Sequence, residues 1–110
     1  MVKTPRGGYD GKGVRVVRDA GEAADWLAAG PPLLVEERVG FVRELAQQIA
    51  RRPGGESALY PLVESTQRDG VCAEVIAPAP HGGRVAQAAA RIATSIADGL
   101  GVTGMLAVEL

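Results

Sequence analysis

The stretch KTPRGGYDGKG at residues 3–13 decides how this sequence is interpreted. It holds four glycines and two lysines in eleven residues. Glycine lets the backbone turn tightly and approach a ligand closely, and lysine supplies positive charge, so the stretch offers what a polyphosphate needs. Its spacing matches neither a Walker A loop nor a dinucleotide-binding fingerprint. Asp-Gly and Gly-Gly are also turn dipeptides, so a hairpin and a phosphate loop are equally good interpretations, and the two are compatible.

The composition excludes several classes of protein. A length of 110 residues allows one domain at most, and 46% hydrophobic with 23% charged residues is typical of a globular chain. The net charge of −1 gives no reason to expect nucleic acid or a membrane surface as partner, and the apolar runs are too short for a transmembrane helix. The single cysteine indicates a reducing cytoplasm. We expect Cys72 to be a small core residue and His81 a surface loop residue, and one residue of each kind excludes a zinc site.

The hydrophobic pattern predicts an α+β fold with two helices and a largely antiparallel sheet. Asp19 is the expected cap of the first helix, and the second carries an apolar stripe of Val85, Ala89, Ile92, Ile96 and Leu100. Residues 43–51 fit both a helix, which local propensity favours, and a strand. The expected helices are residues 20–29 and 83–100, and the expected strands are residues 14–18, 33–38, 57–65, 71–77 and 104–109.

Glu109 stands out because it lies within MLAVEL at residues 105–110, which has the pattern of a buried strand. A buried carboxylate needs a partner, and Mg²⁺, which prefers oxygen ligands, is one. The alternative is that Glu109 points outward at a sheet edge, and the strand alone favours this.

Further motifs follow the glycine-rich stretch in a fixed order. They are VEE at residues 35–37, Glu44, YPLVE at residues 60–64, Asp69-Gly70 and GMLAVE at residues 104–109. With Lys3 and RGGYDGKG, they resemble the ATP-grasp part of the ATPase subunit of phosphoribosylaminoimidazole carboxylase, also called 5-(carboxyamino)imidazole ribonucleotide synthase. The resemblance covers essentially the whole chain, and RGGYDGKG is its most specific part.

The resemblance implies a partial ATP-grasp domain over residues 1–110, part of a longer protein whose N-terminal substrate domain and C-terminal part lie outside these residues. It also implies that residues 44–51 form a strand against their helix propensity. The family's reaction converts ATP, bicarbonate and aminoimidazole ribonucleotide to carboxyaminoimidazole ribonucleotide, ADP and phosphate, with Mg²⁺. Lysines and the metal would offset charge on the transferred phosphoryl group. A homodimer and a cytoplasmic location are the corresponding expectations.

The site residues are implied in the same way, and none is a covalent catalyst. Lys3 would contact ATP, Glu44 the ribose and Glu109 the magnesium ion. Gln67 stands where the family often has a histidine near the nucleotide. The flap over the phosphates, which we expect to be mobile without nucleotide, would be Gly8, Tyr9, Asp10, Gly11, Lys12, Gly13 and Val14, and the adenine contacts would be Glu36, Glu37, Arg38 and Val39.

Two alternatives stay open. One is another ATP-grasp ligase, such as a formate-dependent glycinamide ribonucleotide transformylase or a biotin carboxylase. The other is a non-catalytic binding module with a glycine-rich hairpin, which titration with Mg-ATP would distinguish.

Overall fold

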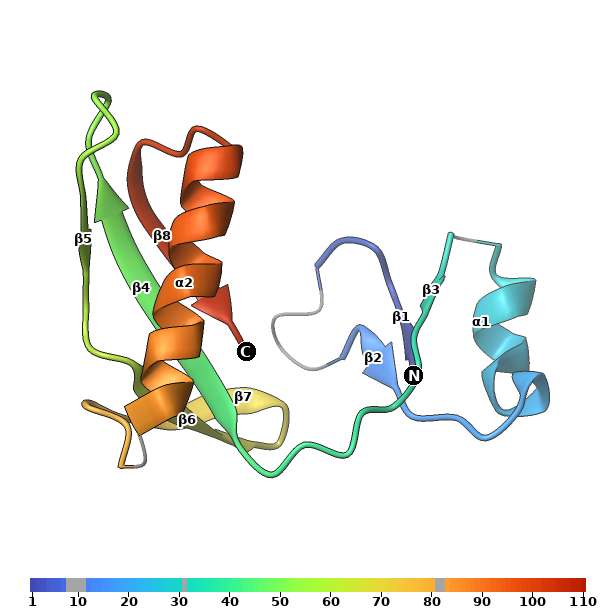
Figure 1. The fold of residues 1–110 in the computed structure, drawn as a ribbon. Coiled ribbons are helices and arrows are strands. Elements are labelled where there is room, and N and C mark those ends of the chain that lie inside the picture. The colour runs from blue at the N-terminus through green and yellow to red at the C-terminus, as the bar shows by residue number, and fades with distance from the viewer. Residues whose placement is uncertain (8–11, 31, 81–82) are drawn as a thin grey trace. The chain divides into compact units, whose positions relative to one another are not determined.

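The computed structural model describes residues 1–7, 12–30, 32–80 and 83–110 (Figure 1). These residues divide into two compact units, each with its own sheet. Unit 1 comprises residues 1–41 and 67–71, and unit 2 comprises residues 42–66 and 72–110. In the described residues, no helix has the length and hydropathy that crossing a bilayer requires.

The sheet of unit 1 has three short strands in the order β2-β1-β3. The central strand β1 (Val2–Lys3) pairs antiparallel with β2 (Val14–Arg15) and with β3 (Leu34–Val35). The glycine-rich stretch therefore connects two paired strands, as the hairpin interpretation predicted. β2 and β3 are shorter than expected because, in the described residues, β1 pairs with each of them through Val2 and Lys3 alone.

A short helical segment accompanies this sheet. The 3-10 helix η1 (Ala20–Ala23) runs into α1 (Ala24–Ala28). Asp19 caps it as predicted, because its Oδ1 accepts hydrogen bonds from the N–H groups of Gly21 at 2.8 Å and Glu22 at 3.3 Å. The chain leaves the helix through Gly30, whose φ of 79° is accessible to glycine at little cost.

The centre of the unit 2 sheet is β4 (Glu44–Arg51). One edge of β4 pairs with β5 (Ser57–Leu59) and then β6 (Val63–Arg68), and the other edge pairs with β8 (Gly104–Glu109). The strand that the resemblance implied over residues 44–51 is thus confirmed, and the helix that local propensity favoured is wrong. Pairing along both edges outweighs the helix propensity of Glu, Leu, Ala, Gln and Arg.

The single strand expected over residues 57–65 is instead two strands, β5 and β6. The break contains Pro61, which cannot donate to a ladder. Gln47 on β4 spans the gap, because its Nε2 donates to the carbonyl of Tyr60 at 2.7 Å and to that of Gln48 at 3.0 Å. The Gln47 side chain is only 2% exposed, so these bonds satisfy a polar group in the core.

The edge strand β7 (Val71–Ile76) pairs with β6 across a tight turn at Asp69 and Gly70, both with positive φ, as the turn dipeptide predicted. All six residues of β7 are exposed. Cys72 is therefore exposed, and its expected place in the core is wrong. The alternating pattern of residues 71–76 indicated a strand with one buried face. In the described residues, however, β7 is an edge strand that pairs with β6 alone. His81 lies outside the described residues.

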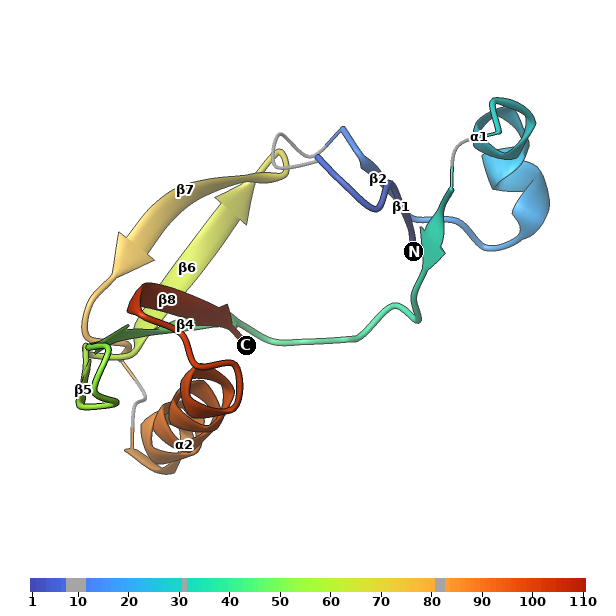
Figure 2. The ribbon, with the colours of Figure 1, turned by 90° about the horizontal axis from the view of Figure 1, so that it is seen from above.

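The long helix α2 (Gly83–Gly99) covers one face of the unit 2 sheet (Figure 2). Ala89, Ala93 and Ala97 form the buried face and pack with Leu45 and Ile49 of β4. The larger residues of the predicted stripe are exposed: Val85 at 49%, Ile92 at 43%, Ile96 at 36% and Leu100 at 74%. Because alanine is small, the helix packs close to the sheet, and the large side chains lie at the side of the helix, outside the contact.

Candidate functional site

Unit 1 contains a cavity of about 570 Å³, lined by Met1, Lys3, Val16 and residues 36–41. Among the lining residues are several of the predicted nucleotide contacts, namely Lys3, Glu36, Glu37, Arg38 and Val39. A volume of this size is within the usual range for small-molecule and cofactor sites.

Strand alternation explains why Lys3 and Glu36 meet in this cavity. Lys3 pairs with Leu34 across β1 and β3, and Glu36 follows Leu34 by two residues, so all three are on the same face of the sheet. The backbone N–H of Glu36 donates to the carbonyl of Met1 at 2.9 Å, which continues the pairing beyond β3. The Lys3 ammonium forms an ion pair with Glu36 Oε2, and both side chains are partly exposed.

The segment that follows Glu36 has no regular structure. In the described part of the chain, the backbone N–H groups of residues 37–40 donate to no other backbone group. They are therefore available to a ligand, since a backbone polar group needs a partner or water. Val39 is 70% exposed and Phe41 64% exposed, so the same cavity has apolar surface beside its charged end. A charged end, open backbone groups and apolar surface are the usual features of a small-molecule or cofactor site.

Only the second half of the predicted flap is described. Gly8, Tyr9, Asp10 and Gly11, and with them the expected mobility of the flap, lie outside the described residues. Gly13 accepts a hydrogen bond at its carbonyl from the Thr4 N–H at 2.9 Å, just beyond the β1–β2 pairing.

Unit 2 brings Glu44 and Glu109 to one face of its sheet. Glu109 pairs directly with Ala46, and Glu44 lies two residues along β4, so the two carboxylates are diagonal neighbours. This face is opposite the one that α2 covers, because Leu45, Ile49, Leu106 and Val108 point toward the helix. Glu109 is exposed, so of the two alternatives for this residue the outward position, which the strand alone favoured, is observed.

The face that carries Glu44 and Glu109 fits a magnesium ion in its chemistry. Mg²⁺ is commonly held by one or two carboxylates together with substrate phosphates and water. The described residues contain no group of three or more His, Cys, Asp or Glu side chains gathered as a metal site. A metal here would thus depend on a ligand's own oxygens as well as on the protein.

Gln67 is exposed near the end of β6, two residues before Asp69. In the described residues it is not part of the wall of the unit 1 cavity.

Sequence analysis missed the apolar lining of the cavity, Val16 and Phe41. Val16 could have been found from alternation after Val14. Phe41 could not, because it lies in a segment without a period.

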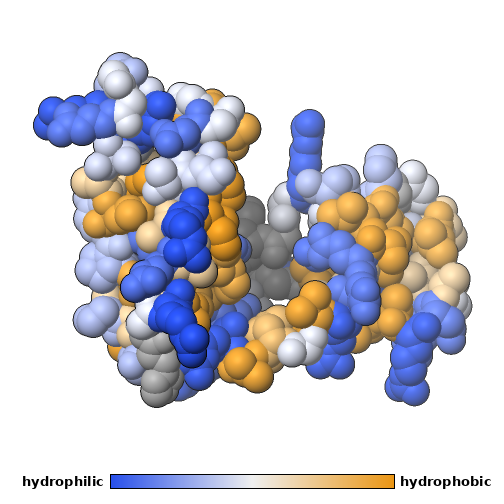
Figure 3. All heavy atoms as spheres, viewed as in Figure 1, coloured by the Kyte–Doolittle hydropathy of each residue, from blue (hydrophilic) through white to orange (hydrophobic). Residues whose placement is uncertain are grey.

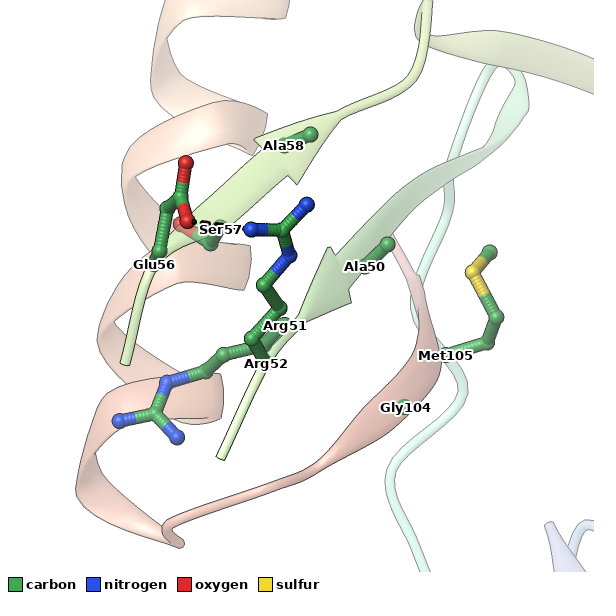
Figure 4. A pocket seen from close by; sticks show the side chains of 8 residues that line it. All are labelled: Ala50, Arg51, Arg52, Glu56, Ser57, Ala58, Gly104 and Met105. Atoms are coloured by element: carbon green, nitrogen blue, oxygen red, sulfur yellow. Dashed lines mark hydrogen bonds and ion pairs between the residues drawn. The ribbon is translucent and has the colours of Figure 1, made fainter. Parts of the chain in front are cut away.

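A second hollow, in unit 2, has a volume of about 400 Å³ and holds none of the predicted site residues (Figure 4). It lies where β4, β5 and β8 meet, and its charged wall includes Arg52 and Glu56, which pair with each other at 3.0 Å. Over α2, hydrophilic side chains form a band with hydrophobic ones beside it (Figure 3). Neither feature shows a ligand's chemistry as clearly as the unit 1 cavity does.

Comparison with known proteins gives consistent matches. The N5-carboxyaminoimidazole ribonucleotide synthase of Mycobacterium tuberculosis (strain H37Rv) is 53% identical over 115 aligned positions, which span 100% of this chain and 27% of the relative. The synthetase structure from Thermus thermophilus matches with a TM-score of 0.83 and 33% identity, over 98% of this chain and 29% of that one. A structure of an N5-carboxyaminoimidazole ribonucleotide synthetase in complex with ADP matches with a TM-score of 0.84 and 35% identity, over the same shares.

The chain thus spans little more than a quarter of the length of these relatives. The resemblance seen in the sequence is confirmed, and so is the expected partial fold. The family model of the ATP-grasp domain matches residues 1–110, and the chain belongs to the ATP-grasp family.

Proposed function

We propose that this chain is the ATP-binding portion of a longer ATP-dependent carboxylating ligase of purine biosynthesis. The observation that supports the proposal is the unit 1 cavity, which Lys3 and residues 36–39 line together. The Mycobacterium tuberculosis relative compared above is named an N5-carboxyaminoimidazole ribonucleotide synthase, and one of the similar structures is an ADP complex.

In the proposed reaction, ATP phosphorylates bicarbonate to carboxyphosphate and ADP is released. The amine of aminoimidazole ribonucleotide then takes the carboxyl group, and phosphate leaves. The protein's task is to position polyanions and to offset their charge.

Lys3 and Glu36 would contact adjacent parts of the nucleotide, because their side chains form an ion pair. The Lys3 ammonium would bind phosphate oxygen in competition with Glu36. The open backbone of residues 37–39 would meet the edge of the adenine, and Val16 and Phe41 would contact its apolar faces. Glu44 would bind the ribose, and Gly13 and Val14 would belong to the phosphate flap.

Glu109 would hold Mg²⁺, which when bound would offset charge on the phosphates. A role for Gln67, a cytoplasmic location and a homodimer remain predictions. Cell fractionation and light scattering would check the last two.

The test is ADP release by the full-length protein with bicarbonate and aminoimidazole ribonucleotide. We expect release to require both, with carboxyaminoimidazole ribonucleotide as product. Release that instead requires formate with glycinamide ribonucleotide, or biotin, would assign another ATP-grasp activity. Absence of Mg-ATP binding in a calorimetric titration would leave only the non-catalytic module.

Lys3→Ala tests the cavity itself. We expect the KM for ATP to rise by about ten- to a hundredfold, since a charge-assisted contact to phosphate is worth about 1.5–3 kcal/mol and each 1.4 kcal/mol is tenfold. Arg52→Met is a matched control, because it removes an exposed cation from unit 2 and should leave the KM unchanged. Equal KM values for Lys3→Ala and wild type would remove Lys3 from the site.

A further inference from the structure

The end of the glycine-rich stretch is held by very little backbone pairing. β2, which follows it, is an edge strand of two residues, and in the part of the chain that the structure describes its ladder consists of Val2 with Arg15 and Lys3 with Val14. An isolated two-stranded hairpin is marginally stable in water, so such a short strand needs another constraint to keep its register.

The side chain of Arg15 supplies that constraint. Its Nη1 donates to Asp25 Oδ1 at 2.6 Å and its Nη2 to Asp25 Oδ2 at 3.0 Å, a two-pronged contact. Nη1 also donates to the carbonyl of Glu22 at 3.0 Å. The guanidinium carbon lies 4.5 Å from the centre of the Trp26 ring, within the range of a cation–π contact. Four separate contacts thus join a two-residue strand to η1 and α1.

The guanidinium is not free to act as a phosphate ligand. Asp25 neutralises its charge, and the hydrogen bond from Arg15 lowers the pKa of the Asp25 carboxyl, so the pair stays ionised. Arg15 and its partner Val2 also share the face of the sheet opposite the one that carries Lys3 and Val14. Arg15 therefore acts from behind the strand and not from within the cavity.

These contacts of Arg15 bear on the register in which β2 pairs with β1. A slip of one residue would move Val14 to the helix side and Arg15 to the cavity side, because side chains alternate along a strand. It would also shift Gly13, whose carbonyl accepts from the Thr4 N–H at 2.9 Å.

We propose that Arg15 is a positioning residue, which locks the register of β2 through Asp25, Glu22 and Trp26 and so places Gly13 and Val14 for nucleotide binding. This inference rests on the proposed function. It adds a role for a residue outside the cavity, through contacts that no nucleotide-binding motif predicts.

The first test is titration of the full-length protein with Mg-ADP, at a temperature where circular dichroism shows each variant to be folded. Arg15→Met and Asp25→Ala should each weaken affinity on the order of fivefold. The double variant should lose no more than Arg15→Met alone, because that change already removes the contact with Asp25. Arg15→Lys keeps the charge but not the fork, so it should fall in between, and it serves if Arg15→Met does not fold.

Arg18→Met is the matched control. Arg18 precedes the same helix and lies 3.6 Å from Glu22, but its side chain is 91% exposed. The affinity of this variant should equal that of the wild type. Wild-type affinity in folded Arg15→Met or Arg15→Lys, or an equal loss in Arg18→Met, would overturn the inference.

The second test needs no nucleotide. The Thr4 amide hydrogen should exchange on the order of tenfold faster in Arg15→Met or Arg15→Lys than in the wild type, because its acceptor Gly13 is no longer held. Unchanged exchange would refute the register lock. If the wild type does not bind Mg-ADP, the proposed function fails, while this exchange measurement still decides whether the lock exists.

Discussion

The carboxylate of Glu109 is exposed on the uncovered face of a sheet, and this determines what its replacement should do. In the full-length protein, Glu109→Gln should lower turnover on the order of 100-fold, since an amide lacks the charge that binds the metal. The urea midpoint should hardly change, because the side chain makes no buried contact.

Glu56→Gln is the control for this prediction, as Glu56 is also exposed on unit 2 and forms an ion pair with Arg52. It should alter neither turnover nor stability. Turnover of Glu109→Gln equal to that of Glu56→Gln would remove Glu109 from the metal site.

The lowered pKa of Asp25 predicts that the free energy of unfolding decreases at acidic pH. The hydrogen bond from Arg15 lowers the pKa of Asp25 in the folded state, while the unfolded state has an ordinary value of about 3.9. The folded state therefore binds fewer protons, and the contribution of the pair is complete above about pH 3.9 and is lost as the pH falls through the folded pKa. Glu22, the nearest other carboxyl on this segment, is turned to Arg18, where its Oε2 accepts from the backbone N–H at 3.0 Å.

We expect the urea midpoint of the wild type to fall more than that of Asp25→Asn between about pH 5 and about pH 3. The effect should be small, because the pair is solvent-exposed. Identical pH dependence of the two proteins would show that this pair contributes nothing to acid sensitivity.

At the scale of the element, α2 packs through alanine, and this makes its buried face intolerant of larger residues. Ala93 is fully buried against Ile49 and Ala97. Ala93→Leu should lower the free energy of unfolding by about 1–3 kcal/mol through overpacking. Gln87→Leu, an exposed position of the same helix, should change it by less than about 0.5 kcal/mol. Chemical denaturation measures both, and equal values would mean that the helix can move away from the sheet.

The same helix shows how far sequence analysis reaches. The length of α2 follows from the regular spacing of its apolar residues. That spacing does not show which side of a broad apolar face packs against the sheet. The sheet has room for Ala89 and Ala93, so it excludes Ile92 and Ile96 from the centre of the contact. That choice depends on the distance between helix and sheet, which is a tertiary quantity.

The strands also show which features the sequence predicts and which depend on tertiary contacts. Pairing along both edges of β4 decides that it is a strand, whereas local propensity alone indicated a helix. Pro61 marks the break between β5 and β6, and the buried amide of Gln47 satisfies the Tyr60 carbonyl there, which local sequence does not indicate. Motif order predicted Lys3 and Glu36 as site residues. It did not single out Arg15, whose contacts with Asp25 and Trp26 form only when η1 and α1 pack against β2.

At the scale of the whole molecule, the share of the relatives that this chain covers predicts how activity is distributed. The chain spans 27–29% of the relatives that were compared, so most of their length lies outside the matched region. Bicarbonate and aminoimidazole ribonucleotide must be held as well as ATP, and a misplaced reactant loses most of the benefit of proximity.

We therefore expect the 110 residues alone to show no carboxylation and only weak binding of Mg-ATP, whereas the full-length protein should release ADP when bicarbonate and aminoimidazole ribonucleotide are both present. Parallel assays of ADP release, with calorimetric titration of both proteins, measure the difference. Lys3→Ala in the full-length protein should raise the KM for ATP without abolishing turnover. That result would show that the cavity of unit 1 contributes to ATP binding. Turnover by the 110 residues at the full-length rate would show that they hold every group the reaction needs and would overturn this division of the site.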